Sequence, residues 1–277
     1  MILGWITALS VLAAVLAGIF GGEAGVFALL LRVGGTFLGC WVGLAALAAL
    51  FLFLVCATVD MEKPREEDSP FFRRLMYPYI EALMWLVLID LKTAGLEKTP
   101  KEGRFLLVCN HQNESDPGVL HHAFRHSQLA FISKKENATM PIVNKFMHMT
   151  LCQMIDREND REALKTILKC IGMIREDKVS VAVFPEGGIK AEHKLTPFRP
   201  GVFKIAQKAN VPIVVCTLKG TTDLFRNIRK LKRTKVELHL LEVIPAEDLK
   251  GRTTVEISDY VHRLVAKDLG PEWILEE

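Results

Sequence analysis

The stretch LLVCNHQNESDPGVL, residues 106–120, indicates the fold class, because an apolar run is followed there by a polar segment. It opens with an apolar run of the length and composition that form a buried strand. Polar residues follow, and Asp116 directly before Pro117 is typical of a helix start. The stretch therefore predicts a strand, a loop and a helix, which is the repeating unit of an α/β domain.

Four further apolar runs also have the length and composition of buried strands. Between several of them lie segments whose apolar residues recur at helical spacing. With the first, the predicted strands are FLLVCN (105–110), QLAFIS (128–133), SVAVFP (180–185), VPIVVCTL (211–218) and VELHLLEVI (236–244). Within residues 161–176, helical spacing places five apolar residues on one face: Leu164, Ile167, Leu168, Ile171 and Ile174. We therefore predict an α/β fold with a central, mainly parallel sheet flanked by helices.

The N-terminal part of the chain is far more apolar than the rest. Residues 1–22 and 33–59 contain no charged side chain, and each stretch exceeds the ~20 residues that cross a hydrocarbon core. We expect two transmembrane helices within residues 1–59, then a charged linker at 60–70 and a domain at 71–277. A cleaved signal peptide is the alternative for the first stretch, although no Lys or Arg precedes it.

Charge and cysteine usage indicate where the domain lies. Basic side chains cluster after the second span, so the positive-inside rule places residues 71–277 on the cytoplasmic face, of the plasma or inner membrane. Residues 61–277 carry 34 basic and 30 acidic side chains, an excess that suits an anionic lipid surface but not nucleic acid. The six cysteines show neither Cys-x-x-Cys nor metal-ligand spacing, which predicts reduced thiols and no metal site.

The stretch FFRRLMYPYIEALMWLVLIDL, residues 71–91, is too short in its uncharged core to span a bilayer. That core, residues 82–89, would reach only ~12 Å as a helix. Arg73 and Arg74 at its start favour a helix lying in the membrane interface. A buried core helix fits the same pattern.

Polar residues after the apolar runs are the candidate site, because ligands of open α/β sheets bind beyond the carboxyl ends of strands. His111 leaves the first run, and a turn would bring the Asp116 carboxylate to its ring, fixing the tautomer and freeing a base. A helix cap with no chemical role is the alternative for Asp116. The turn at Glu186, Gly187 and Gly188 offers backbone N–H groups for an anion.

Basic side chains lie close to these two places in the sequence. Lys190 and Arg199 follow the glycine turn, and Arg157 comes between an apolar run and a helix beginning near Asp160. Each is a candidate for an anion contact, although most surface arginines and lysines are only solvated charges.

Taken in order, four blocks resemble the lysophosphatidate (1-acylglycerol-3-phosphate) acyltransferases, a glycerolipid acyltransferase family. The blocks are NHQNESD, MIDRENDREALKTI, FPEGGIK with LTPFRPGVFKIA, and VPIVVCTLKG. They cover roughly residues 85–250, and four blocks in order are far more specific than one. The third departs from the family pattern, because Gly188, Ile189 and Lys190 stand where Thr-Arg-Ser is usual.

The resemblance implies acyl transfer from a thioester, acyl-CoA or acyl-carrier-protein, to the sn-2 hydroxyl of a membrane lipid acceptor, lysophosphatidate. The product would be phosphatidate for phospholipid synthesis, with no cofactor besides the co-substrate and no metal. His111 would be the base, Asp116 its partner and Arg157 the first choice for the acceptor phosphate, while Glu186 would contact the acceptor.

Several alternatives stay open from the sequence. Another lysophospholipid or glycerol-3-phosphate could be the acceptor, or the dyad could serve a phospholipid remodelling transacylase or hydrolase. A lipid-binding scaffold with a degenerate site is a third class. Cys109 lies two residues before His111 on the same predicted strand face, which raises an acyl-cysteine intermediate. His121, His122 and His126 are expected to be solvated surface residues.

Overall fold

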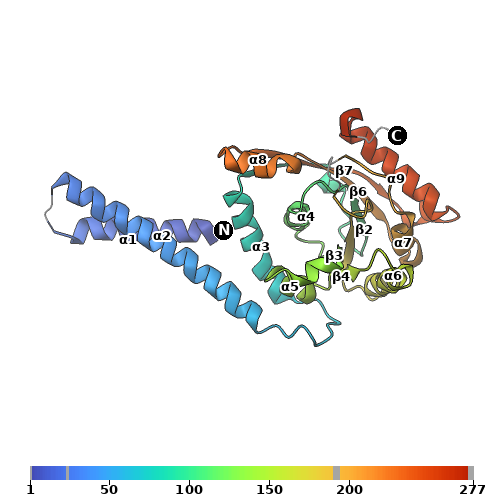
Figure 1. Cartoon of the computed structure of the whole chain (residues 1–277), viewed down its shortest axis with the longest axis horizontal. Coiled ribbons are helices and arrows are strands. Elements are labelled where there is room, and N and C mark those ends of the chain that lie inside the picture. Colours follow the sequence, from blue (N-terminus) through green and yellow to red (C-terminus); the bar gives the residue numbers. More distant parts are fainter. Residues whose placement is uncertain (1, 23–24, 190–193, 274–277) are drawn as a thin grey trace. The chain divides into compact units, whose positions relative to one another are not determined.

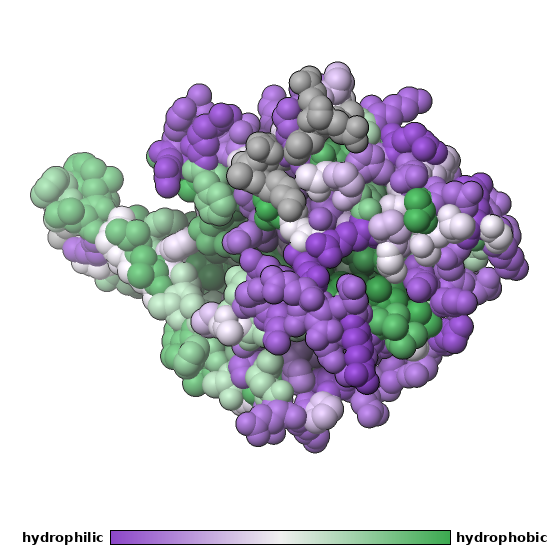
Figure 2. All heavy atoms as spheres, turned by 45° about the vertical axis from the view of Figure 1, so that its right-hand side comes forward, coloured by the Kyte–Doolittle hydropathy of each residue, from purple (hydrophilic) through white to green (hydrophobic). Residues whose placement is uncertain are grey.

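The structure is a computed structural model, and it describes residues 2–22, 25–189 and 194–273. The chain divides into two compact units, Met1–Lys63 and Pro64–Glu277. The N-terminal unit consists of α1 (Ile2–Phe20) and α2 (Val26–Ala57), which pack together, with Trp41 Nε1 donating to Thr7 Oγ1 at 3.2 Å. Both helices are long and apolar enough to cross a membrane, and hydrophobic atoms dominate their surface (Figure 2).

The C-terminal unit is built on one sheet of seven strands within the described residues. Their order is β1-β7-β6-β2-β5-β3-β4. The bounds are β1 (Ile89–Ala94), β2 (Leu106–Cys109), β3 (Leu129–Lys134), β4 (Gln153–Ile155), β5 (Ser180–Val183), β6 (Ile213–Lys219) and β7 (Thr234–Ile244). From β6 to β4 all neighbours are parallel; β7 is antiparallel to β6, and β1 is parallel to β7. The predicted α/β fold with a mainly parallel sheet is confirmed.

Helices cover both faces of this sheet, as Figure 1 shows. Their bounds are α3 (Pro70–Leu86), α4 (Asp116–Ala123), α5 (Val143–Met149), α6 (Asp160–Arg175), α7 (Lys204–Ala209), α8 (Leu224–Arg229) and α9 (Thr254–Leu269). The alternation along β2 explains the layers: Leu107 joins the core under α4, whereas Leu106 and Val108 join the core under α6, α7 and α9. All four residues of β2 are therefore buried, as expected for a central parallel strand.

The helix expected over residues 71–91 is shorter than predicted. It ends at Leu86, and Ile89 begins β1, which pairs with β7. The chain changes direction at Leu88, whose φ of 58° lies in the left-handed region and cannot continue a right-handed helix. An apolar run followed by Asp90 suits either a helix or a strand, so the local sequence pattern could not show where the helix ends and the strand begins.

The start of α3 is buried in the domain rather than presented to headgroups. Arg73 is only 4% exposed and donates to Asp68 Oδ2 at 2.7 Å and to the carbonyl oxygens of Leu129 and Thr150. These contacts fix α3 to β3 and to the end of α5. The core-helix alternative therefore holds for the N-terminal half of α3.

The apolar face predicted for α6 is confirmed only in part. Ile167, Ile171 and Ile174 are buried, whereas Leu164 and Leu168 are exposed. The five positions cover a wider arc than the stripe that faces the sheet, so those at its margin stay outside the core.

Candidate active site

The predicted site residues meet because their strands are parallel neighbours. Asn110 and His111 follow β2, the segment from Phe184 to Gly188 follows β5, and Arg157 follows β4 two residues beyond its end. The carboxyl ends of parallel strands share one edge of a sheet, so these three segments lie at that edge.

His111 and Asp116 form a hydrogen-bonded pair, with 2.9 Å between His111 Nδ1 and Asp116 Oδ2. Asp116 is fully buried, and the same Oδ2 accepts the backbone N–H groups of Gln112 at 2.7 Å and Asn113 at 2.8 Å. A carboxylate that accepts from Nδ1–H fixes the tautomer, so the other ring nitrogen, Nε2, carries a lone pair. This arrangement can take a proton from a hydroxyl group.

Asp116 is not the helix cap that its position before Pro117 suggests. It is the first residue of α4, and its side chain turns back to the loop that carries His111. The helix-start prediction is correct in position, but the carboxylate orders the loop and the imidazole instead of the helix N–H groups.

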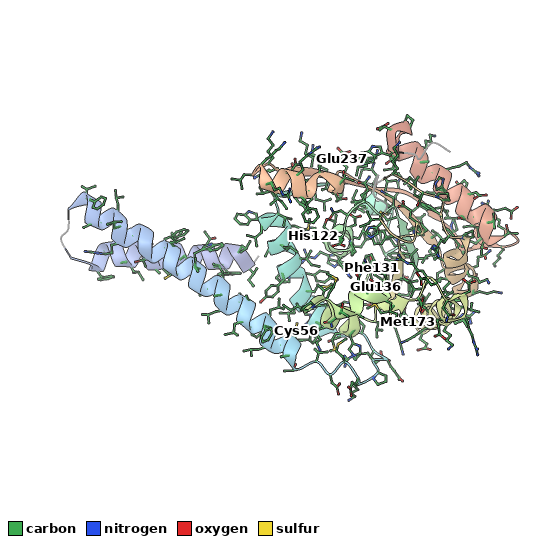
Figure 3. All side chains as sticks on the ribbon, viewed as in Figure 1. Cys56, His122, Phe131, Glu136, Met173 and Glu237 are labelled. Atoms are coloured by element: carbon green, nitrogen blue, oxygen red, sulfur yellow. The ribbon has the colours of Figure 1, made fainter. Side chains whose placement is uncertain are left out.

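Two residues that the sequence reasoning did not single out fix the His111 loop. The Asn110 side chain makes two hydrogen bonds to the backbone of Leu218, at 2.8 and 2.9 Å, and so ties the end of β2 to β6. The His111 ring stacks on Phe184 with centroids 4.0 Å apart. Phe184 stacks in turn on Phe131 of β3, with ring centroids 5.8 Å apart. Phe131 is buried in the core of the C-terminal unit (Figure 3). In the sequence, the Asn directly before His111 and the Phe directly before Pro185 were the features that could have indicated these two contacts.

Glu186 connects the glycine turn to the His111 loop. Its Oε1 accepts the backbone N–H of His111 at 2.7 Å, and its Oε2 accepts the backbone N–H of Thr196 at 3.2 Å. The side chain is buried, and this burial raises the pKa of Glu186 to about 7. The first of these hydrogen bonds ties Glu186 to the His111 loop and so helps to position His111.

This raised pKa predicts how stability depends on pH. Between pH 4.5 and 7 the folded chain binds more protons at Glu186 than the unfolded chain, so the free energy of unfolding falls as pH rises through this range. The fall should be about 3 kcal/mol at most. We expect Glu186→Gln to flatten this dependence, as measured by thermal unfolding in detergent at pH 5, 6, 7 and 8. Parallel curves for wild type and variant would contradict the assignment.

Two arginines meet at the glycine turn. Arg157 Nη1 donates to the carbonyl oxygen of Gly187, and Arg199 Nε lies 2.6 Å from where a Cβ on Gly187 would stand. Gly187 also has a φ of +77°, so a side chain there would be strained and would displace Arg199. Burial and the neighbouring Arg199 lower the pKa of Arg157. Two adjacent guanidinium groups favour an anion between them.

The turn supplies fewer backbone donors than expected, because the Gly187 N–H is used within it. It donates to the Phe184 carbonyl oxygen at 3.2 Å. Of the two predicted glycine donors, Gly188 is thus the one that we retain as a candidate. Its φ of +149° again requires glycine.

A cavity of about 480 Å³ adjoins the two arginines. Arg157, Arg199 and Lys204 contribute the cationic lining, and Phe184 is shared with the His111 stack. The remaining lining is mostly apolar and includes Ile132, Ile155, Leu164, Ile167 and Val202. The exposed Leu164 therefore belongs to a cavity wall, and the cavity suits a molecule with an anionic group and a hydrocarbon portion.

The other sequence candidates have different outcomes. Lys190 lies outside the described residues. Cys109 is fully buried, and burial raises the pKa of its thiol well above the usual value, so it does not form the thiolate that an acyl-cysteine intermediate needs.

The three histidines after the site do not behave alike. His121 is buried against Phe131, and this burial lowers its pKa to about 3, so the solvated reading is wrong for His121. His122 is half-buried on α4 (Figure 3), and His126 is exposed. Among the described residues, no group of histidine, cysteine and carboxylate side chains has the arrangement of a metal site.

The structure combines an α/β fold with a hydrogen-bonded His111–Asp116 pair and a glycine turn flanked by two arginines, and known proteins resemble the chain in sequence and in fold. Residues 90–219 match the family model described as Acyltransferase. The chain is 30% identical over 177 residues to a 1-acyl-sn-glycerol-3-phosphate acyltransferase of Chlamydomonas reinhardtii, covering 63% of this chain and 51% of that relative. It is also 30% identical over 138 residues to the 1-acyl-sn-glycerol-3-phosphate acyltransferase of Saccharomyces cerevisiae, covering 49% and 45%.

A solved structure has the same fold. The 1-acyl-sn-glycerophosphate acyltransferase PlsC from Thermotoga maritima superposes with a TM-score of 0.60 at 20% identity, covering 96% of both chains. The chain spans about half the length of the curated relatives it matches. Its predicted resemblance to the lysophosphatidate acyltransferases is confirmed by these matches.

Proposed function

We propose that this chain is a glycerolipid acyltransferase that moves a fatty acyl group from an acyl thioester to the sn-2 hydroxyl of lysophosphatidate. The product is phosphatidate for phospholipid synthesis. The observation that carries the proposal is the His111–Asp116 pair at the sheet edge where Arg157 and Arg199 flank the glycine turn. A base and an anion site at one edge match an acceptor that has both a hydroxyl and a phosphate.

The dyad supplies the proton transfers of this reaction. His111 Nε2 takes the proton of the acceptor hydroxyl while its oxygen attacks the thioester carbonyl carbon. Asp116 stabilises the imidazolium that forms. The carbon–sulfur bond then breaks, and the imidazolium returns the proton to the leaving thiolate. The Gly188 N–H is our candidate donor to the oxyanion of the tetrahedral intermediate.

The cationic end of the cavity is the proposed phosphate site. Arg157 has a guanidinium fork suited to two phosphate oxygens, and Arg199 is its neighbour on Gly187. Lys190 stays a candidate from the sequence. We assign Glu186 to positioning His111 and, as the family resemblance implies, to contacting the acceptor, because Oε1 accepts one hydrogen bond from His111 and a carboxylate oxygen can accept a second.

The N-terminal unit supports a proposal for the location of the chain. We propose that α1 and α2 anchor the chain in the plasma or inner membrane, with the C-terminal unit at the cytoplasmic face. Acyl-CoA or acyl-carrier-protein enters as co-substrate, and the lipid acceptor comes from the bilayer. No separate cofactor and no nucleic-acid partner belong to the proposal.

The test is an acyl-transfer assay with detergent-solubilised full-length protein. Acyl-CoA and acyl-carrier-protein are offered side by side with lysophosphatidate, other lysophospholipids and glycerol-3-phosphate, and products are measured by mass spectrometry. We expect phosphatidate from lysophosphatidate. Fatty acid release, or transfer between phospholipids without any thioester, would instead establish the hydrolase or transacylase alternative.

A substitution of Arg157 tests the phosphate site. We expect Arg157→Ala to raise the KM for lysophosphatidate by about 10- to 100-fold, because a charge-assisted hydrogen bond contributes about 1.5–3 kcal/mol. The activity toward monoacylglycerol, which lacks the phosphate, should change little. Arg161→Ala is the matched control, since Arg161 is exposed on the adjoining helix α6. Equal effects on both acceptors would contradict the assignment.

A further inference from the structure

The turn between α8 and β7 presents a leucine to solvent. Leu231 is 85% exposed and has a left-handed φ of 52°, which is uncommon for a leucine. It lies two residues beyond the end of α8, and its N–H donates to the Ile228 carbonyl oxygen at 3.0 Å. Phe225, at the start of the same helix, is also exposed. Within the described residues, the C-terminal unit leaves both apolar side chains uncovered.

Positive charge predominates around Leu231, and Asp90 lies beside Lys235 in the register of β1 and β7. Residues 224–236 contain six cations and no Asp or Glu. Arg226 pairs with Asp223 at 2.8 Å, just before this stretch. The other five are exposed: Arg229, Lys230, Lys232, Arg233 and Lys235. An apolar tip within a cationic ring is the composition that binds anionic bilayers.

The end of α3 lies beside this turn. The Thr234 N–H donates to the Leu88 carbonyl oxygen at 2.8 Å, and Thr234 pairs with Ile89 in the register of β1 and β7. The last residues of α3 therefore come next to residues 230–233, as Figure 1 shows for the ends of α3 and α8. Leu83, Trp85 and Leu86 at this end are exposed, and Trp85 is 62% exposed. Tryptophan favours the level of lipid headgroups.

We propose that this α3–α8 edge, formed by Leu83, Trp85, Leu86, Phe225 and residues 229–233, binds the surface of an anionic bilayer. The cations contact lipid phosphates, while Leu231 and Trp85 enter the interface. A lipid surface fits better than an acidic protein, because the exposed apolar residues include a tryptophan and lie beside several exposed cations. The edge would hold the C-terminal unit against the membrane independently of α1 and α2.

A fluorescent probe at the tip tests this edge in the full-length chain. Leu231→Cys carries a nitrobenzoxadiazole label in a background with Cys40, Cys56 and Cys152 changed to Ala, and the protein is placed in nanodiscs. Leu168→Cys is the matched control: it is an exposed leucine on α6, which packs on β4 at the opposite edge of the sheet. In phosphatidylglycerol nanodiscs, we expect the fluorescence emission of the label at residue 231 to shift to shorter wavelength and to be quenched by spin-labelled lipid. The label at residue 168 should show neither change.

Charge reversal then separates electrostatic binding from mere proximity. In the variant Lys232→Glu with Arg233→Glu, the label at residue 231 should need more anionic lipid to reach half of its maximal fluorescence change. We expect the required mole fraction to rise by at least about threefold. Lys169→Glu with Lys208→Glu, two exposed lysines on α6 and α7, should leave it unchanged. An identical 231 signal in neutral and anionic nanodiscs, or equal signals at 231 and 168, would overturn the proposal. A response only to soluble acyl-carrier-protein would also overturn it. None of these measurements depends on the proposed reaction.

Discussion

His111→Ala should lower kcat for acyl transfer by about 10²- to 10⁴-fold, the contribution expected of a positioned general base. The structure leaves Nε2 available because Nδ1 is engaged by Asp116 at 2.9 Å. A lipid hydroxyl is a weak nucleophile at neutral pH, so its attack on the thioester depends on this nitrogen. Acyl transfer to lysophosphatidate is measured in detergent with saturating thioester.

The control for this variant is His122→Ala, since His122 is half-buried on α4 and belongs to no part of the dyad. We expect the kcat of His122→Ala to stay within about twofold of the wild-type value. Substitutions outside the core and outside buried polar networks usually change stability by only ~0.5 kcal/mol. The thermal midpoint of His111→Ala must be measured as well, because the imidazole stacks on Phe184. Full activity in a folded, wild-type-free preparation of His111→Ala would contradict the proposed base.

The pairing of His111 with Asp116 could be predicted because it is local. Five residues separate the two, and a loop between a strand and a helix can bring them together without help from the rest of the fold. The parallel direction of β6, β2, β5 and β3 likewise follows the general tendency of buried apolar strands to form a parallel sheet, whereas the sequence predicted no order for them. What the pattern could not decide was whether the carboxylate caps the helix or holds the imidazole.

The contacts of Glu186 could not be predicted, because they join residues 75 positions apart. Its hydrogen bond to the His111 N–H exists only because β2 and β5 are neighbours in the sheet. The approach of Arg199 to Gly187 depends in the same way on tertiary contacts, among them the hydrogen bond from the Arg199 N–H to the Pro185 carbonyl oxygen at 2.9 Å. Sequence spacing carries no information on such long-range geometry.

The strands that the sequence missed are the least apolar or the shortest. β1 has the sequence IDLKTA and lies at one edge of the sheet, where its second half is exposed. β4 has three residues, too few for a period-2 pattern to be recognised. Tertiary pairing with β7 and β3, not local propensity, makes each of them a strand.

Asp116→Asn should reduce kcat by about 10²-fold or more while leaving the fold in place. The amide oxygen can still accept the N–H groups of Gln112 and Asn113, so the loop keeps a partner for them. The negative charge opposite the imidazolium is lost, and so is its stabilisation of the transition state. Asp116→Ala should in addition lower stability by about 1–3 kcal/mol, because both buried N–H groups lose their acceptor.

The two variants therefore separate the two roles of one carboxylate. Glu114→Gln is the matched control, since it removes a charge from the same loop at an exposed position. We expect wild-type kcat for Glu114→Gln, low kcat with a near-normal thermal midpoint for Asp116→Asn, and low values of both for Asp116→Ala. If Asp116→Asn retained wild-type kcat, Asp116 would only order the loop, and His111 would act without an ionised partner.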